Sequence, residues 1–561
     1  MSLLRLLAVV ALVSFSLAAC EDGKDGADGT NGSNGSNGAN RSNGSNGTNG
    51  EPGRDGFASA YLEKLGTFET GAFDESAAEI VAFDAASARA FVVNGADKTV
   101  DILDVSNPSA PTLISQIDVT AAGTDLGGAN SVDVYDGTLA VAIEADPKQN
   151  AGLVAFYQVS DATLLGTAPA GALPDMLTFS PDGNKVLVAN EGEPNDDYDI
   201  DPEGTITVID VSVGFASATA TQLNFNTFDA DIAGLRQSGV RIFGPGASVS
   251  QDLEPEYIAV SPDSSMAWVS LQENNALAVV DLNTLSITDV LPLGTKNHSI
   301  AGFELDASDR DNAINIMSWP VLGMFQPDSI AAYESNGRVY LVTANEGDAR
   351  DYAGFSEEVR IADVTLDPTV FPTAMFLQDD ANLGRLQVTN TLGDEGDDDD
   401  FDALYAFGAR SFSIWDTETG TMVFDSGSDF EVITAQRLGS MFNTSNDENE
   451  GDSRSDAKGP EPEALAIGDI DGQTFAFIGL ERTGGIMVYN IENPENPVFC
   501  SYMPARDFSV DFDDTNFELA GDLGPEGIEF VSADNSPTGE NMLLVANEVS
   551  GTTTLYTIRT R

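Results

Sequence analysis

The sequence is poor in histidine, and this shortage excludes several classes of enzyme. His298 is the single histidine among 561 residues, so HExxH proteases and zinc sites built on several histidines are excluded. A Ser-His-Asp triad would have to use His298, but the sequence has no GxSxG motif. Gly294-Thr295-Lys296 lacks the upstream glycine that a Walker A loop requires.

Basic residues are also scarce, at 25 Lys and Arg against 91 Asp and Glu. The resulting net charge of −66 argues against nucleic-acid binding, which needs a basic surface. It favours divalent cations, a basic partner surface or simple solubility. An acidic proteome from a saline habitat would explain the total charge equally well.

The chain has two cysteines and no apolar run long enough to span a bilayer in the mature protein. Arg5, the apolar run 6–17 and the small residues after it predict a signal peptide over 1–19. Leu17-Ala18-Ala19-Cys20 resembles the bacterial lipobox, which implies lipidation of Cys20 and attachment to the cell envelope, at the outer membrane or cell surface. An ordinary signal peptide is the alternative. Cys500 then has no partner for an intrachain disulfide.

Residues 20–57 form a low-complexity segment with glycine at nearly every third position from Gly23 to Gly56, interrupted at Arg41. The Gly-X-Y pattern is that of collagen, but Pro52 is its single proline. We therefore expect a flexible tether, with a trimerising stalk as the alternative.

The remaining chain is organised in repeats. Residues 173–198 (LPDMLTFSPDGNKVLVANEGEPNDDY) contain two short apolar runs separated by the turn residues Pro181-Asp182-Gly183, then an acidic loop. Residues 205–211 alternate with period two and predict a third strand. The same order recurs at 255–282, 327–352, 462–491 and 525–558, and more loosely at 78–105 and 129–159.

Repeats of four strands every 40 to 50 residues or so are typical of a β-propeller. The sequence therefore predicts an all-β fold over 58–561, a seven- or eight-bladed β-propeller of the YVTN/WD40-like kind. The last repeat has three strands, so we expect the spare strand 60–68 to complete it and close the ring. The irregular segment 401–430 makes eight blades if counted separately and seven if merged with the preceding repeat.

Acidic residues follow the proline that opens several repeats, and others end the second strand of the same repeats. Because strands one and two are antiparallel, we expect both positions at one mouth of the central channel. Such a ring needs metal ions or basic side chains to offset the repulsion between its carboxylates. Arg350, Arg482 and Lys458 lie in segments from which they could supply this positive charge. Oxygen ligands suit Ca²⁺ or Mg²⁺, and solvated loops or structural caps are the alternative. The predicted Ca²⁺ ligands are drawn from Asp175, Glu191, Asp197, Asp199, Asp201, Glu256, Glu273, Asp328, Glu346, Asp348, Glu463, Glu481, Glu526 and Glu548.

Several long motifs identify a family: VANEGEPNDDY (188–198), VTANEGDARDY (342–352), ERTGGIMVYNI (481–491) and VANEVSGTTTLY (545–556). They resemble the choice-of-anchor I family, bacterial relatives of the mesenchyme-specific cell-surface glycoprotein of sea-urchin skeleton-forming cells. The resemblance implies a surface-displayed propeller, here anchored through Cys20, and an interaction with calcium or mineral. The GPEG segments are more weakly similar to esterase-like phytases. Some bacterial members carry an alkaline-phosphatase label, but the serine and metal-histidine pattern of the usual alkaline phosphatases is absent here.

Three functional hypotheses follow from these features. The first is a non-enzymatic, surface-anchored propeller that binds Ca²⁺ and, through it, an acidic, mineral or cell-surface partner. The second is a calcium-dependent phosphoric-ester hydrolase with His298, Lys296 and Arg350 as catalytic candidates. The third is a scaffold for other surface proteins. None involves nucleic acid, and the membrane enters through the N-terminal lipid alone.

Overall fold

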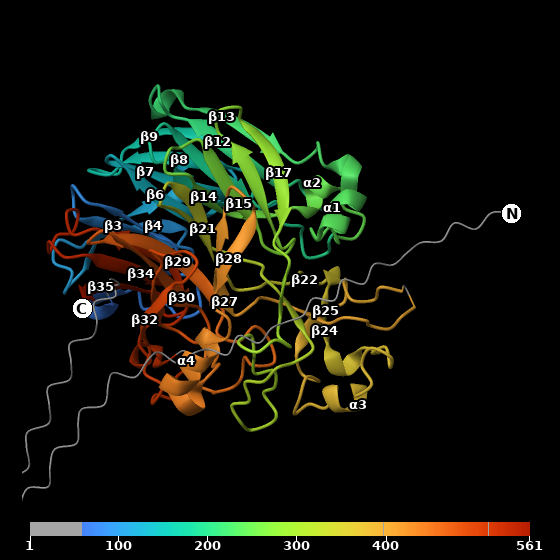
Figure 1. Ribbon diagram of the computed structural model, residues 1–561. Helices are drawn as coiled ribbons and strands as arrows, with labels where there is room; N and C mark the ends of the chain where they lie inside the picture. Colours follow the sequence, from blue (N-terminus) through green and yellow to red (C-terminus); the bar gives the residue numbers. More distant parts are fainter. Residues whose placement is uncertain (1–58, 397, 514) are drawn as a thin grey trace, which may run out of the picture. The chain divides into compact units, whose positions relative to one another are not determined.

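The computed structural model describes residues 59–396, 398–513 and 515–561, which form small antiparallel sheets (Figure 1). Within these ranges seven sheets have four strands each, and we number them blades 1 to 7 along the chain. The all-β propeller predicted from the repeats is confirmed. No helix in the described ranges is both long and apolar enough to cross a membrane.

Blades 1 to 4 each use four consecutive strands. Blade 1 contains β2 (Val81–Asp84), β3 (Arg89–Asn94), β4 (Thr99–Asp104) and β5 (Thr112–Asp118). Blade 2 contains β6 (Leu126–Tyr135), β7 (Thr138–Ala145), β8 (Ala151–Gln158) and β9 (Leu164–Ala172). Blade 3 contains β10 (Pro174–Phe179), β11 (Lys185–Asn190), β12 (Thr205–Asp210) and β13 (Thr219–Asn224). Blade 4 contains β14 (Pro255–Val260), β15 (Met266–Leu271), β16 (Ala276–Asp281) and β17 (Ser286–Pro292).

Blades 5 and 7 are assembled from segments distant in sequence. Blade 5 contains β20 (Ile330–Ser335), β21 (Arg338–Asn345), β27 (Ser411–Asp416) and β28 (Thr421–Asp425), so the irregular segment belongs with the preceding repeat. Blade 6 contains β29 (Pro462–Ile470), β30 (Gln473–Leu480), β31 (Ile486–Asn490) and β32 (Val498–Met503). Blade 7 contains β33 (Pro525–Val531), β34 (Met542–Asn547) and β35 (Thr552–Thr560), and β1 (Ala60–Glu69) pairs with β35 as its fourth strand.

Two groups of short elements lie outside the blades, and those between β21 and β27 are yellow in Figure 1. Between blades 3 and 4 stand α1 (Ile232–Ser238) and α2 (Val249–Asp252). The remaining elements are β18 (Thr295–Asn297), β19 (Leu322–Met324), β22 (Asp351–Tyr352), β23 (Phe355–Ser356), β24 (Glu358–Arg360), α3 (Ala374–Leu377), β25 (Gln387–Thr389), β26 (Tyr405–Ala406) and α4 (Asp429–Leu438).

The hydrophobic core lies between the blades. Each neighbouring pair of blades shares one cluster of buried side chains, and blades 7 and 1 share another. Both faces of a blade are therefore covered, which explains why β11 is a continuous apolar run with five consecutive buried residues and not an alternating one. The innermost strands also contact one another in the order β2, β6, β10, β14, β20, β29, β33 and again β2.

The turns and the strand register set the geometry of the channel. Gly183 has a φ of +68°, and a Cβ there would lie 2.1 Å from the Tyr135 ring, so both conformation and space favour glycine in this turn. Pro174, at the start of β10, pairs with Asn190, at the end of β11. The acidic residues that follow these two positions, Asp175 and Glu191, therefore lie at the same edge of the blade, as predicted.

Candidate functional site

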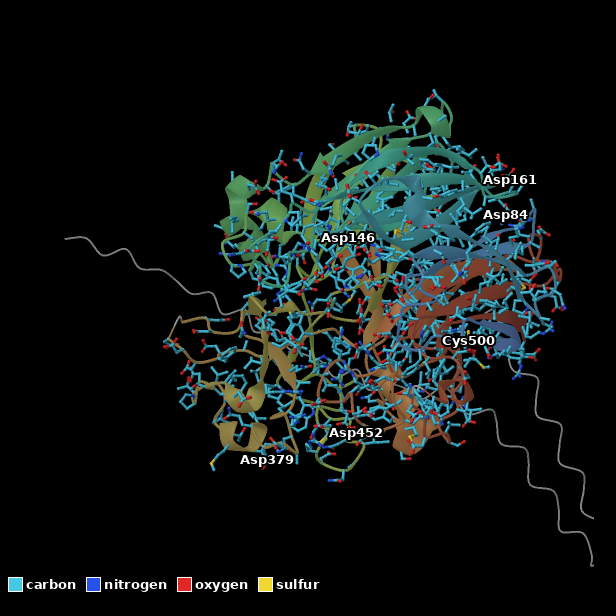
Figure 2. All side chains as sticks on the ribbon, turned by 180° about the vertical axis from the view of Figure 1, so that it is seen from behind. Asp84, Asp146, Asp161, Asp379, Asp452 and Cys500 are labelled. Carbon is cyan, nitrogen blue, oxygen red and sulfur yellow. The ribbon has the colours of Figure 1, made fainter. Side chains whose placement is uncertain are left out.

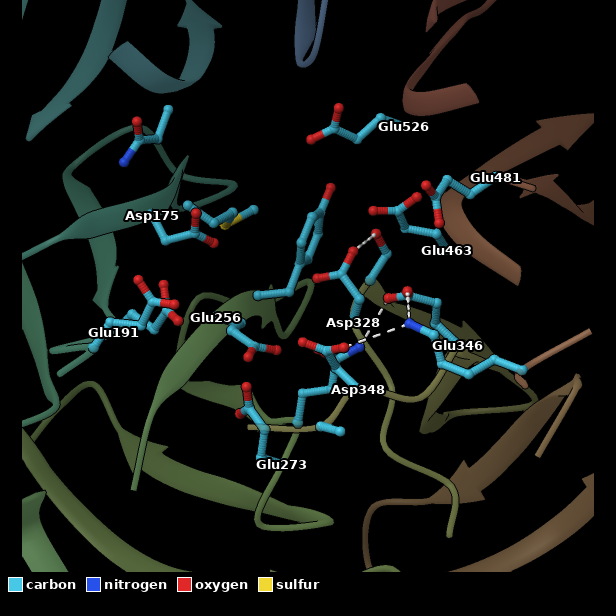
Figure 3. A pocket seen from close by; sticks show the side chains of 18 of the residues that line it. Asp175, Glu191, Glu256, Glu273, Asp328, Glu346, Asp348, Glu463, Glu481 and Glu526 are labelled. Atoms are coloured by element: carbon cyan, nitrogen blue, oxygen red, sulfur yellow. Dashed lines mark hydrogen bonds and ion pairs between the residues drawn. The ribbon is translucent and has the colours of Figure 1, made fainter. Parts of the chain in front are cut away.

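A cavity of about 520 Å³ opens where the innermost strands begin, and acidic side chains dominate its wall. Figure 3 shows ten of them pointing into the space from several blades. Twelve acidic residues but only two basic ones, Lys458 and Arg482, line the cavity. Ten of these acids are among the predicted ligands: Asp175, Glu191, Glu256, Glu273, Asp328, Glu346, Asp348, Glu463, Glu481 and Glu526.

The register of the blades explains why residues from four of the repeats meet here. Pro255 pairs with Leu271, Pro462 with Leu480 and Pro525 with Asn547. Each pairing places the acid after the proline beside the residues that follow the second strand. Because the first strand of every blade is innermost, repetition of this one pairing carries acidic side chains around the channel.

Several of these carboxylates are buried without a partner for one of their oxygens. Among the described residues, this holds for Glu254 Oε1, Glu256 Oε2, Glu273 Oε2, Glu463 Oε2 and Glu526 Oε2. The residues Glu254, Glu256 and Glu273 are only 0%, 7% and 5% exposed. An ionised carboxylate is costly to bury unless it is paired, hydrogen-bonded or bound to a metal. The cavity wall therefore lacks the positive charge that its carboxylates would need in order to be ionised.

The pKa values follow from this environment. Burial, reinforced by neighbouring carboxylates, raises the pKa of Asp175 to about 7 and that of Glu481 to about 8. Burial also raises the pKa of Glu273 to about 7, although Arg350 opposes the shift. The pKa values of Glu256 and Glu463 are raised well above the ordinary range for the same reasons. Without additional cations, part of this wall holds protons near neutral pH.

Close groups of three carboxylates identify the places where one ion could be held. In each group, one oxygen from every member lies within 4.8 Å of the others. Four of these groups draw on the residues of the cavity wall and its border: Glu191, Glu254 and Glu273; Asp328, Glu346 and Glu463; Glu346, Glu461 and Glu481; Glu79, Glu526 and Glu548. The predicted ligand Glu548 thus lies near Glu526, although it does not line the cavity.

Sequence reasoning missed Glu79, Glu193, Glu254, Asp351 and Glu461. Glu254 and Glu461 each precede the proline of a Glu-Pro-Glu sequence. The acid on each side of the proline was the sequence feature that could have indicated them. Both lie behind the cavity wall with 0% exposure. Their surroundings differ: Arg350 contacts Glu254, whereas Arg454, Lys458 and Arg482 all contact Glu461.

Three of the predicted ligands, which are close together in sequence, are not brought together as a group. Asp197, Asp199 and Asp201 lie in the connection between β11 and β12 and form none of the three-carboxylate groups found among the described residues. The Asp199 carboxylate instead accepts a hydrogen bond of 2.8 Å from Asn195 Nδ2. Burial raises the pKa of Asp201 to about 6, and its Oδ1 has no partner in the described part of the chain.

The three catalytic candidates are buried and do not line the cavity. Lys296 Nζ lies 3.0 Å from Asp425 Oδ1 and donates to the carbonyl oxygen of Ala409 at 2.9 Å. His298 Nδ1 donates to the carbonyl oxygen of Phe303 at 2.6 Å, and burial lowers its pKa to about 3, with a smaller contribution from Lys296.

Arg350 is likewise engaged in a buried network. Its Nη1 lies 2.6 Å from Asp252 Oδ1, and its Nη2 lies 2.9 Å from Glu254 Oε2. The three candidates thus share no surface with the cavity, whose lining includes none of them.

The predicted signal peptide, the lipidation site Cys20 and the tether all lie outside the described residues. Cys500, labelled in Figure 2, lies on β32 and is half-buried.

Comparison with known proteins covers most of the propeller. Residues 79–494 match the family described as the choice-of-anchor I domain. The chain is 30% identical over 321 residues to the mesenchyme-specific cell surface glycoprotein of Strongylocentrotus purpuratus, covering 49% of this chain and 41% of that protein. It is 32% identical over 191 residues to gigasin-3a of Magallana gigas, covering 33% of this chain and 67% of that one. The match thus spans less than half the length of the sea-urchin relative.

Solved structures show more distant likenesses. Kuenenia stuttgartiensis hydrazine synthase aligns with a TM-score of 0.43 and 11% identity, over 86% of this chain and 96% of that chain. The β-propeller domain of Cps50 (Swd1) from Myceliophteria thermophila aligns with a TM-score of 0.40 and 8% identity, over 89% of this chain and 99% of that chain.

Proposed function

Because the chain belongs to the choice-of-anchor I family, we propose that this surface-associated β-propeller binds divalent cations, chiefly Ca²⁺, at the mouth of its channel. The observation that carries the proposal is the set of buried carboxylate oxygens without partners, represented by Glu256 Oε2 and Glu273 Oε2. Both residues are more than nine-tenths buried and line a cavity with twelve acidic and two basic residues.

Chemistry favours Ca²⁺ over other metals. The candidate ligands on the wall are carboxylates, which are hard oxygen ligands, and among the described residues neither His298 nor Cys500 lines the cavity. Ca²⁺ accepts six to eight oxygens in flexible arrangements, whereas Mg²⁺ requires a tighter octahedron. A ring assembled from separate blades suits the more adaptable ion.

The cation would also connect the propeller to a partner. An ion bound at the cavity surface keeps coordination positions that an acidic polymer, a mineral surface or a carboxylate of another surface protein could fill. We further propose that Cys20 carries the lipid that holds the protein at the cell envelope. No observation favours the hydrolase, since Lys296, His298 and Arg350 are engaged in buried contacts and do not line the cavity.

Titration calorimetry on the full-length, chelator-treated protein tests the proposal. We expect Ca²⁺ to bind at submillimolar concentration, Mg²⁺ to bind more weakly, and Ca²⁺ to raise the unfolding temperature because it binds the folded state. The exposed Asp161, in the turn after β8 and labelled in Figure 2, supplies a control: Asp161→Asn should leave binding unchanged. Absence of both binding heat and a thermal shift at millimolar Ca²⁺ would refute the proposal.

A further inference from the structure

Two of the three-carboxylate groups are built in the same way at two different blade junctions. The first, group A, joins Glu191 at the end of β11 to Glu254 and Glu273 of blade 4. The second, group B, joins Glu346 at the end of β21 to Glu461 and Glu481 of blade 6. In both, the central member directly precedes the proline that pairs with the last residue of the second strand, Leu271 or Leu480.

Group B contains its own cations. Lys458 Nζ lies 2.9 Å from Glu346 Oε1 and 3.1 Å from Glu461 Oε2. Arg482 Nε lies 3.2 Å from Glu481 Oε1. Although burial opposes ionisation, Lys458, Arg454 and Arg482 lower the pKa of Glu461 to about 2. The three carboxylates of group B are thus matched by three basic side chains.

Group A lacks this supply of positive charge. Within the described residues its only ion pair joins Glu254 Oε2 to Arg350, while Glu191 and Glu273 form none. Glu254 Oε1 and Glu273 Oε2 have no partner there, although these residues are 0% and 5% exposed. When all three carboxylates are ionised, the single guanidinium leaves at least two negative charges uncompensated, and Arg350 is additionally shared with Asp252.

The sequence shows how this difference arises. Arg482 is the second residue after Leu480, and Glu273 is the second residue after Leu271. Blade 4 therefore carries an acid where blade 6 carries a base. The position next to Leu271 is Gln272, so the third carboxylate of group A is displaced by one residue relative to Glu481.

We propose that one Ca²⁺ ion is bound by Glu191, Glu254 and Glu273, in the place corresponding to the basic side chains of group B. The proposal rests on the function proposed above and assigns the ion to one site. Ca²⁺–oxygen distances of about 2.3 to 2.6 Å place opposite ligands about 5 Å apart. The 4.8 Å limit within group A is therefore compatible with a single ion.

An ion bound at this site would also connect two blades, because its ligands come from both. Glu191 belongs to the end of blade 3, and Glu254 and Glu273 flank the first two strands of blade 4. An ion that contacts all three would clamp neighbouring blades together at the channel, as Lys458 links Glu346 of blade 5 to Glu461 of blade 6.

Calorimetry with site variants of the full-length protein tests the assignment. We expect Glu254→Gln and Glu273→Gln to weaken Ca²⁺ binding at least tenfold, while Asp101→Asn, at a buried acid of β4 that does not line the cavity, changes it less than threefold. Glu463→Gln alters the separate group of Asp328, Glu346 and Glu463 and shows whether the ion is held there instead. If Glu463→Gln abolished binding and Glu273→Gln did not, the channel would still bind Ca²⁺, but our assignment would be wrong. If the unsubstituted protein bound no Ca²⁺ at all, the proposed function itself would be refuted.

Two substitutions that change a charge distinguish a Ca²⁺ ligand from a residue whose role is only structural. Glu273→Arg copies Arg482 into group A, so we expect it to abolish Ca²⁺ binding yet keep a high unfolding temperature in chelator. Lys458→Met removes the ammonium of group B, so we expect one additional Ca²⁺ per protein. Unaltered Ca²⁺ affinity in Glu273→Arg, or unchanged stoichiometry in a folded Lys458→Met protein, would contradict the assignment.

Discussion

Gln272 of blade 4 donates a hydrogen bond of 2.9 Å from Nε2 to Oε2 of Glu346 in blade 5. Gln272 follows Leu271 as Glu481 follows Leu480, so an amide replaces an acid at this point of the channel. The amide gives Glu346 a donor and removes one negative charge from the wall. Neutral side chains therefore help to hold the carboxylates together, in addition to the few basic ones.

Replacing this amide tests its role. Gln272→Glu would set two carboxylates against each other, so we expect it to lower the free energy of unfolding by about 1 to 3 kcal/mol at pH 8. The loss should be smaller at pH 5, where one carboxyl can carry a proton. Denaturant unfolding in chelator at both pH values measures the effect, and equal stability of the variant and the parent at pH 8 would contradict it.

The stability of the cation-free protein should depend on pH in an unusual direction. Burial raises the pKa of Glu273 from 4.5 to about 7 and that of Glu481 from 4.5 to about 8. A raised folded-state pKa means that the folded protein binds protons more tightly than the unfolded chain. The stabilising contribution is therefore complete below pH 4.5 and is lost as the pH rises through about 7 and 8.

We accordingly expect the unfolding temperature in chelator to fall between pH 5 and pH 8. Saturating Ca²⁺ should reduce this fall, because metal binding displaces the protons. The depressed pKa of Glu461, about 2, acts only at lower pH and does not affect this interval. Thermal unfolding scans at several pH values give the answer, and a rising unfolding temperature over this range would count against the prediction.

Arg350 should be a structural residue. It is fully buried between Asp252 and Glu254, and its guanidinium lies 4.5 Å from the ring centre of Phe243. Arg350→Met would leave two buried carboxylates without their partner, so we expect a loss of about 3 to 5 kcal/mol in the free energy of unfolding.

A surface arginine provides the comparison for Arg350. Arg559 pairs with Glu63 and Glu540 but is 37% exposed, so Arg559→Met should change the free energy of unfolding much less than Arg350→Met. Chemical denaturation of both variants distinguishes the two environments. If both variants lost a similar free energy of unfolding, the Arg350 network would not stabilise the protein as expected.

The predicted lipid anchor can be tested independently of the propeller. Cys20→Ser should remove the lipid and shift the protein from the membrane fraction to the soluble fraction after cell lysis. Cys500→Ser, which changes the other cysteine on β32, should leave the protein in the membrane fraction. Cell fractionation shows where each variant is located, and intact-mass measurement shows whether it carries a lipid. Retention of Cys20→Ser in the membrane fraction would contradict lipidation at this residue.

Much of the architecture followed from local patterns. The alternation of short apolar runs with turns such as Pro181-Asp182-Gly183 determined strands too short and too numerous for any helical or doubly wound fold. The three-stranded last repeat and the spare strand at 60–68 anticipated the pairing of β1 with β35. The prolines and strand ends indicated which edge of each blade would carry Asp175, Glu191 and their equivalents.

Which acids have partners depends on the folded arrangement of distant segments. Lys458 reaches Glu346 across more than a hundred residues of sequence, and Arg350 meets Glu254 across ninety-six. No local pattern encodes such meetings, because they depend on how the insertions fold onto the channel. The repeating edge of carboxylates could be predicted from the sequence alone. The three-dimensional arrangement decided that group B receives basic side chains whereas group A does not, because burial makes the free energy of each charge depend on its immediate neighbours.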